Sequence, residues 1–272
     1  METINGTRTA LITGAGRGIG RSVAEKLLSD GWTVGVYDIS GDQAWAEGRP
    51  NAIVGTLDVT DPDQWESVLA DFTAQAGGLD LLLNNAGILY GGAFEDSDHR
   101  TDATIVDVNV KGVIHGCRAA FPYLKARVAE GRRPLVINMS SAAAIYGTPD
   151  MATYSATKFA VRGITEALEV EWFPHGIAVR SVMPLFTDTG MLDGVSTSGT
   201  RRMGVRLTPD DVRDQVLAVV EKNLDQEPTP PTKVHYPAGL QAKVLWVGAH
   251  MSPSFLTRFV NGKLTTDRKI TL

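Results

Sequence analysis

Tyr154 and Lys158 stand four residues apart in the segment TYSATKF, residues 153–159. On a helix, residues at this spacing share one face, so the phenol and the ammonium would be neighbours. A nearby cation stabilises a phenolate and lowers the phenol pKa from its usual value of about 10. Such a tyrosine can donate and accept a proton near neutral pH, as a general acid and base does. An ordinary helix surface can carry the same pair, so its meaning depends on the rest of the chain.

A glycine-rich segment near the N-terminus favours a phosphate-binding turn. The sequence TGAGRGIG, residues 13–20, lies between an apolar run and a segment with helical spacing. Gly14, Gly18 and Gly20 permit a tight turn and close backbone approach, although their spacing differs from the common G-x-G-x-x-G pattern. At such a turn a pyrophosphate meets backbone N–H groups and the positive end of a helix. Asp38, at the end of the next apolar run, is positioned to accept hydrogen bonds from an adenosine ribose.

Four more polar positions lie where strands end or interrupt an apolar helix. Asp58 follows the third apolar run, and the turn NNAG, residues 84–87, ends the fourth. Asn109 lies inside a long apolar helical stretch, where asparagine is unfavourable unless it is solvated or has a specific polar partner. Ser141 follows the fifth run, thirteen residues before Tyr154.

Short apolar runs and helical patterns alternate along the chain, which predicts an α/β fold: a single Rossmann-like domain with a doubly wound, mainly parallel sheet flanked by helices. We expect helices after Gly18, from Asp61-Pro62, over about Thr101–Glu130, around Tyr154 and Lys158, and from Thr208. The expected strands are Arg8–Thr13, Thr33–Tyr37, Ala52–Leu57, Leu79–Leu83, Leu135–Met139 and Ile177–Met183.

Within residues 1–272 we expect one domain with three functional parts: a cofactor-binding and catalytic core over about 8–184, a substrate lid over about 185–208, and a C-terminal segment over about 237–272. The lid is rich in Gly, Ser and Thr and follows a strand, where ligands bind in such folds. The C-terminal segment carries apolar clusters that we expect to pack over the substrate pocket or against a neighbouring subunit. Shallow membrane contact is the weaker alternative, because the basic residues there are few and scattered.

Composition narrows the class of protein. The chain has 272 residues and a formal net charge of −5, which argues against a general nucleic-acid binder. The single cysteine, Cys117, excludes an intramolecular disulfide and favours a reducing, cytoplasmic setting. No apolar run is long enough for stable membrane insertion. The five histidines are scattered, so no metal site is expected.

From about Thr9 to Thr189 the sequence resembles the short-chain dehydrogenase/reductase family, on the joint match of the TGxxxGxG turn, NNAG, Asn109, Ser141 and Tyr154-x-x-x-Lys158. The resemblance implies nicotinamide-dependent hydride transfer. It implies that Tyr154 is the general acid and base and that Lys158 holds the nicotinamide ribose and lowers the Tyr154 pKa. It further implies that Ser141 hydrogen-bonds the substrate oxygen, with Ser140 as the neighbouring alternative, and that Asn109 supports a water path to Lys158.

The same resemblance gives an expected cofactor site. Asp38 should repel the 2′-phosphate of NADP, whereas Arg17 could accept it; we let Asp38 decide and expect NAD. Leu185 follows Pro184 where the family often has glycine, which either reshapes the pocket or is harmless. The cofactor residues expected are Gly14, Arg17, Gly18, Ile19, Gly20, Asp38, Asp58, Val59, Asn85, Ala86, Gly87, Tyr154, Lys158, Pro184, Thr187 and Thr189.

The predicted substrate is a neutral, largely apolar secondary alcohol or ketone. Arg201 and Arg202 leave open a second enzyme, a 3-oxoacyl thioester reductase using NADPH. A non-catalytic, nucleotide-sensing protein of the same fold is the alternative of another class, disfavoured by the complete Asn–Ser–Tyr–Lys set. The residues expected around the substrate are Leu89, Tyr90, Ser141, Ala143, Ile145, Met151, Leu185 and Met191.

The helix from about Tyr154 to Trp172 is apolar on more than one face. A helix of this kind is normally buried on both sides, and a sheet covers only one. We therefore expect a homodimer or homotetramer, as the family resemblance also suggests.

Overall fold

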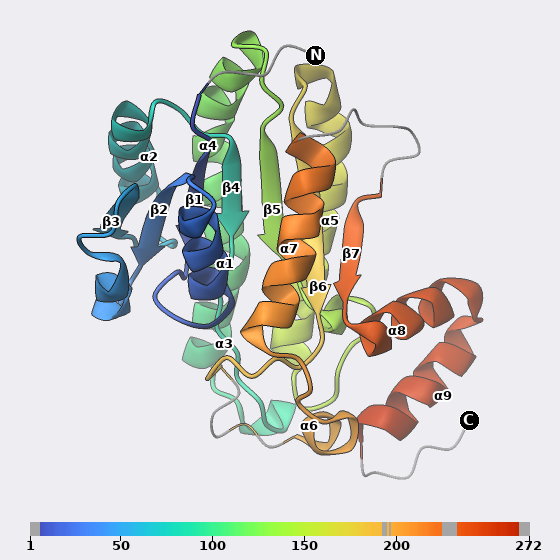
Figure 1. The fold of residues 1–272 in the computed structure, drawn as a ribbon. Coiled ribbons are helices and arrows are strands. Elements are labelled where there is room, and N and C mark those ends of the chain that lie inside the picture. The colour runs from blue at the N-terminus through green and yellow to red at the C-terminus, as the bar shows by residue number, and fades with distance from the viewer. Residues whose placement is uncertain (1–5, 192–194, 196, 225–232, 267–272) are drawn as a thin grey trace.

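The computed structural model describes residues 6–191, 195, 197–224 and 233–266. Within these ranges the chain forms a seven-stranded parallel sheet in the order β3-β2-β1-β4-β5-β6-β7 (Figure 1). The predicted doubly wound α/β fold is therefore confirmed. The strands are β1 (Thr9–Thr13), β2 (Thr33–Asp38), β3 (Ala52–Thr56), β4 (Leu81–Asn84), β5 (Leu135–Met139), β6 (Ala178–Pro184) and β7 (His235–Ala238).

Helices cover both faces of the sheet. Figure 1 shows α1 and α7 in front of the strands, with α2, α4 and α5 behind them. The helices are α1 (Gly18–Ser29), α2 (Pro62–Ala76), α3 (His99–Val106), α4 (Gly112–Ala129), α5 (Ala152–Trp172), α6 (Ser198–Met203), α7 (Pro209–Leu224), α8 (Leu240–Met251) and α9 (Ser254–Thr265).

Strand side chains alternate between two apolar cores, as the two-residue period of a strand requires. In β1, Ala10 and Ile12 join the core under α1 and α7, whereas Leu11 joins the core under α2, α4 and α5. Every residue of β1, β4 and β5 is buried. This double-sided burial explains why these strands read as continuous apolar runs.

A buried ion pair fixes the end of the sheet where the strands begin. Arg127 of α4 donates from Nε and Nη2 to the two carboxylate oxygens of Asp80, each at 2.9 Å. Asp80 also accepts the backbone N–H of Thr9 at 2.9 Å and Nη1 of Arg132 at 3.1 Å. Since both charges are paired and hydrogen-bonded, these interactions offset the free-energy cost of removing the two charges from water.

The structure differs from the sequence-based expectation in three places. The stretch predicted as one helix over 101–130 is α3 and α4 joined by a π-helical turn, Asp107–Lys111. The expected lid contains a short helix, α6, and the expected tail begins with a strand that we did not predict, β7, followed by α8 and α9. Residues 192–194 and 196 of the lid and 267–272 of the tail lie outside the described residues.

Candidate active site

The C-terminal ends of β1 and β4 are joined by a set of hydrogen bonds. The hydroxyl of Thr13 accepts the backbone N–H groups of Asn85 and Ala86, both at 3.1 Å. In return, Nδ2 of Asn85 donates to the carbonyls of Thr13 and Gly14, both at 3.0 Å. The glycine turn and the NNAG turn are thereby fastened together at the point where the strand order reverses, which is where ligands bind in such sheets.

The glycine turn leaves no room for side chains. Gly14 and Gly18 have φ angles of 63° and 57°, which are left-handed values that favour glycine. A Cβ on Gly14 would lie 2.8 Å from Cα of Ala86, and one on Gly20 would lie 2.3 Å from the carbonyl oxygen of Gly14. Helix α1 begins at Gly18, so its free N–H groups lie beside this turn. This arrangement fits the pyrophosphate of a dinucleotide.

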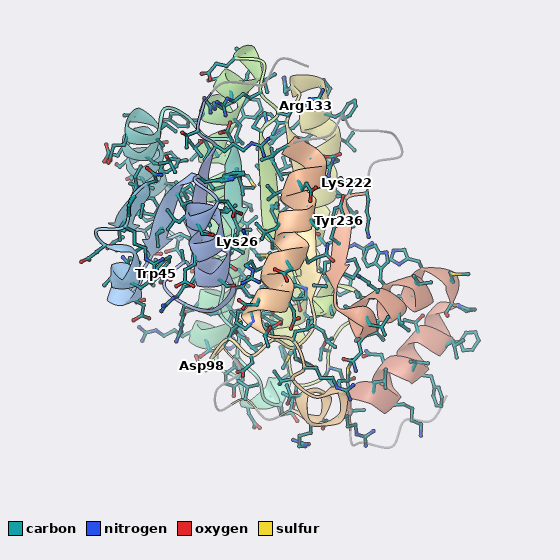
Figure 2. All side chains as sticks on the ribbon, in the orientation of Figure 1. Lys26, Trp45, Asp98, Arg133, Lys222 and Tyr236 are labelled. Atoms are coloured by element: carbon teal, nitrogen blue, oxygen red, sulfur yellow. The ribbon has the colours of Figure 1, made fainter. Side chains whose placement is uncertain are left out.

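Asp38 lies at the adenosine end expected for that dinucleotide. One of its carboxylate oxygens accepts the backbone N–H of Gly16 at 2.9 Å, and the other accepts the N–H and hydroxyl of Ser40 at 3.3 and 3.2 Å. Trp45, labelled at the β2–β3 edge in Figure 2, donates from Nε1 to the carbonyl of Ala15 at 3.1 Å. The acid is thus held at the rim of the glycine turn, and Trp45 is a supporting residue that sequence reasoning missed.

Two adjoining cavities receive most of the expected cofactor residues. Both are lined by Ile19, Asn85, Gly87 and Thr189, so they form one continuous cleft. Gly20 lies behind the glycine turn, outside the lining. The first cavity is also lined by Gly14, Arg17, Gly18, Asp38, Asp58, Val59 and Ala86, and the second by Tyr154, Lys158, Pro184 and Thr187. The residues present therefore fit a nicotinamide dinucleotide, with the glycine turn suited to its pyrophosphate.

Ser141, Tyr154 and Lys158 meet in the second cavity. Tyr154 and Lys158 are on α5, and the Lys158 Nζ lies 5.5 Å from the centre of the Tyr154 ring. Nζ donates to the carbonyl of Met139 at 3.0 Å. Ser141, just after β5, gives Tyr154 a hydrogen bond. Ser140, the alternative serine, donates its hydroxyl to the backbone carbonyl of Lys158 at 3.1 Å and so holds α5 against β5.

The expected lowering of the Tyr154 pKa was wrong. Burial raises the pKa of Tyr154, and the hydrogen bond from Ser141 offsets only part of that rise. Burial also lowers the pKa of Lys158 to about 8. Because both groups are withdrawn from water, desolvation outweighs the attraction that their spacing suggests. At pH 7 the phenol is protonated and the lysine is still mostly charged.

Asn109 lies in the π-helical turn and is buried. Its Oδ1 accepts the backbone N–H of Ile88, while Nδ2 donates to the carbonyl of Ile88 at 2.9 Å and to the hydroxyl of Thr157 at 3.1 Å. Asn109 therefore links the segment after β4 to the residue that precedes Lys158. Asparagine in an apolar helix did signal a specific polar partner, but the π turn that points it there gave no signal of its own.

Most of the expected substrate residues line the same cavity: Leu89, Ser141, Ala143, Met151, Leu185 and Met191. Tyr90 and Ile145 do not. Tyr90 is 37% exposed, and Ile145 packs with Met183 in a separate apolar cluster. The lining also includes residues that the sequence did not indicate, Tyr146, Thr148, Phe186, Met203 and Thr265.

Neither a metal-binding cluster nor a membrane-spanning helix is present in the part of the chain that the structure describes. Among the residues that it describes, no group of three or more His, Cys, Asp or Glu side chains could hold a metal ion. No helix within the described ranges is both long and apolar enough to span a bilayer.

Comparison with known proteins agrees with this geometry. The family model for short chain dehydrogenases matches residues 8–198. A 3-alpha-(or 20-beta)-hydroxysteroid dehydrogenase of Mycobacterium tuberculosis is 38% identical over 191 residues, covering 69% of this chain and 72% of that protein. The chain therefore belongs to the short-chain dehydrogenase family and is an oxidoreductase.

Solved structures extend the similarity to the cofactor. A short-chain dehydrogenase of Burkholderia cenocepacia in complex with NADP has a TM-score of 0.78 at 25% identity, covering 97% of this chain and 99% of that one. A 3-ketoacyl-(acyl-carrier-protein) reductase of Brucella melitensis complexed with NADH has a TM-score of 0.75 at 28% identity, covering 86% and 97%. A nicotinamide dinucleotide is thus the cofactor class, and both forms occur among similar proteins.

Replacing Tyr154 by phenylalanine tests the acid–base assignment. We expect kcat to fall by about 10²–10⁴-fold, the range that general acid–base catalysis contributes, with the melting temperature and cofactor affinity nearly unchanged. Because burial raises the Tyr154 pKa, alcohol oxidation by the wild type should accelerate from pH 7 towards alkaline pH as the phenolate forms. The variant's residual rate should lack this rise. Near-normal turnover in Tyr154→Phe would disprove the assignment.

Proposed function

We propose that this enzyme transfers a hydride between NAD and a neutral, largely apolar secondary alcohol or ketone, with Tyr154 as general acid and base. The observation that carries the proposal is the composition of the second cavity, which is lined by Ser141, Tyr154 and Lys158 and which we call the catalytic cavity. Apart from Lys158, no charged residue lines the part of this cavity that the structure describes. Its remaining wall is mostly apolar and includes Leu89, Ala143 and Leu185, and among the described residues it offers no cation besides Lys158 to hold a carboxylate.

The side chains support a simple proton path. In ketone reduction the substrate oxygen would accept hydrogen bonds from Ser141 and Tyr154, and the protonated phenol would donate its proton as negative charge develops on that oxygen. In alcohol oxidation the phenolate would take the alcohol proton. The Lys158 Nζ lies beside the phenol, 5.5 Å from the centre of the Tyr154 ring, and Asn109 positions α5 through Thr157. When bound, the oxidised cofactor would accept the hydride in alcohol oxidation, and the reduced cofactor, NADH, would supply it in ketone reduction.

A substrate screen tests this function. Purified enzyme is assayed with NAD and NADP over secondary alcohols of increasing apolar size and over hydroxyacyl thioesters, with reduced cofactor followed by absorbance. We expect NAD-linked oxidation of neutral alcohols to exceed every thioester rate. Turnover of thioesters alone, with NADP, would instead assign the 3-oxoacyl reductase activity. Cofactor binding without turnover of any compound would favour the nucleotide-sensing alternative.

The arginines that raised the thioester alternative have other contacts. Arg202 of α6 donates from Nη1 to the backbone carbonyl of Lys263 at 2.6 Å, and Arg201 donates from Nη2 to the hydroxyl of Ser198 at 3.2 Å. Neither residue lines the catalytic cavity. The Arg202 contact joins α6 to α9, whereas the Arg201 contact lies within α6. Both contacts favour a structural role and support the neutral substrate over a phosphate-bearing carrier.

Asp38 supports NAD as the preferred cofactor. Its carboxylate lines the cleft and is fixed by Gly16 and Ser40, so it cannot turn away without losing those hydrogen bonds. A 2′-phosphate about 4 Å away would be opposed by roughly 4 kcal/mol at an effective dielectric near 20. Salt and solvent reduce this value, but half of it still exceeds a tenfold change in affinity. Arg17 lines the same cleft beside the glycine turn. It could therefore contact the pyrophosphate, which NAD and NADP share, and such a contact would not distinguish the two cofactors.

Exchanging Asp38 for serine should narrow or reverse the preference for NAD, because the repulsion is removed and Arg17 becomes free to attract the phosphate. The measurement is kcat/KM for both cofactors in the wild type and in Asp38→Ser. Asp42→Ser is the matched control, since Asp42 lines the same cleft while the Gly16 N–H donates its hydrogen bond to Asp38. A wild-type preference for NADP would show that Arg17 sets the choice.

We also propose that α5 forms a subunit interface. Its outward side chains include Phe159 and Val170, which are 41% and 75% exposed. Light scattering at micromolar concentration should give a dimer or tetramer. Val170→Asp should shift the mass towards a monomer, whereas Phe94→Asp, at a residue 65% exposed outside α5, should not. A monomeric wild type would contradict the proposal.

A further inference from the structure

Helices α8 and α9 project from the body of the molecule at the end of the sheet where the strands terminate (Figure 1). Helix α8 packs on the body through one face, where Ala242 is buried and Leu245, Trp246 and Ala249 pack against the cluster around Met183. We call α8 and α9 together the C-terminal arm. Figure 2 shows side chains of both helices extending away from the sheet.

The outward side of the arm is apolar. On α8 the exposed residues follow one another at steps of four, three and four, so they form one stripe along the helix. Exposed apolar residues continue on α9. These side chains are between 40% and 81% exposed: Leu240, Val244, Val247 and Met251 on α8, and Phe255, Leu256 and Val260 on α9.

Such a surface needs a partner. Single exposed apolar residues are ordinary, but a stripe over two consecutive helices marks an interaction site. A helix that is apolar nearly all round is normally covered on both sides. In α8 the body covers one side only.

The charge of the arm indicates what kind of partner fits. The arm's basic residues, Lys243, Arg258 and Lys263, are few, but no acidic residue offsets them. Between Glu227 and Asp267 the sequence has no Asp or Glu, and Lys233 adds a further cation before the arm, although the whole chain has a net charge of −5. Lys243 on α8 and Lys263 on α9 are exposed. Burial lowers the pKa of Lys233, and the charges of Lys243 and Lys222 lower it further, in keeping with a locally positive field.

A second copy of the chain fits this surface poorly. In a two-fold interface the same patch meets itself, so Lys243 and Lys263 of one arm would face the cations of another. The arm offers no carboxylate to pair with them. An apolar stripe on an arm whose charged residues are all basic instead complements the acyl boundary and phosphates of an anionic bilayer.

We propose that the C-terminal arm is an interfacial anchor that lies on the surface of an anionic lipid bilayer, with its apolar stripe in the headgroup region and its lysines at the lipid phosphates. This is peripheral binding by two short helices that do not span the membrane.

The arm is also part of the substrate cavity wall. Thr265 of α9 lines that cavity, and Asn261 donates from Nδ2 to the carbonyl of Gly147 at 2.7 Å. Resting on the proposed function, this contact would place the mouth of an apolar cavity beside the bilayer that holds apolar alcohols and ketones. Membrane binding itself does not depend on that activity.

The test is co-sedimentation of the full chain with two kinds of vesicle. One is phosphatidylcholine alone, and the other contains about 30% phosphatidylglycerol, which makes its surface anionic. The wild type should bind the anionic vesicles, less so as salt screens the lysines. Val244→Ser/Val247→Ser should weaken binding by about tenfold or more, since two apolar side chains leave the interface. Lys243→Glu/Lys263→Glu should weaken binding to anionic vesicles by about tenfold or more.

Phe173→Ser is the matched control, because Phe173 is 57% exposed and lies outside the arm. It should bind vesicles as the wild type does. All variants should keep their melting temperature and their activity on a water-soluble substrate, which separates failure of the anchor from failure of the enzyme. Absence of wild-type binding to anionic vesicles would overturn the proposal. So would an oligomer that dissociates in Val244→Ser/Val247→Ser, because that result would assign the stripe to a second copy.

Discussion

The junction between β1 and β4 is the constraint on which the site depends. The strand order reverses there, and Thr13, Gly14 and Asn85 close the junction with four hydrogen bonds. These bonds press two turns together so closely that a Cβ on Gly14 would overlap the backbone of Ala86. A cleft follows from this junction, because the chains leaving β1 and β4 must diverge to opposite faces of the sheet. Most of the residues proposed to hold the cofactor lie along that cleft.

The catalytic groups show how burial and reactivity are balanced. Withdrawing Lys158 from water costs free energy, and the carbonyl of Met139 offsets part of that cost through a hydrogen bond. Burial also keeps the Tyr154 phenol protonated, which suits a proton donor to a carbonyl oxygen. Asn109 acts indirectly, by positioning α5. Its amide joins the backbone at Ile88 to the hydroxyl of Thr157 on α5. The π turn supplies the extra residue that lets this amide point inward.

The substrate end of the cleft has a different origin from the cofactor end. The family model ends at residue 198, whereas Met203 of α6 and Thr265 of α9 complete the cavity wall beyond it. Most of the cavity lining lies within residues 8–198, and segments beyond that range complete the wall. The C-terminal arm, which contributes Thr265 to this wall, also carries the exposed apolar stripe.

The sequence by itself determined the α/β class, six of the seven described strands to within a few residues, and the glycine and NNAG turns that line the cleft. These features are local: continuous apolar runs, helical spacing and glycine clusters restrict a chain over a few residues. It did not reveal β7, because His235–Ala238 includes a proline and its position depends on pairing with β6. It misjudged the Tyr154 pKa, because desolvation depends on everything packed around the phenol. Tyr146 and Thr265 joined the cavity only through the tertiary structure, since residues more than a hundred positions apart share a wall only after the chain has packed.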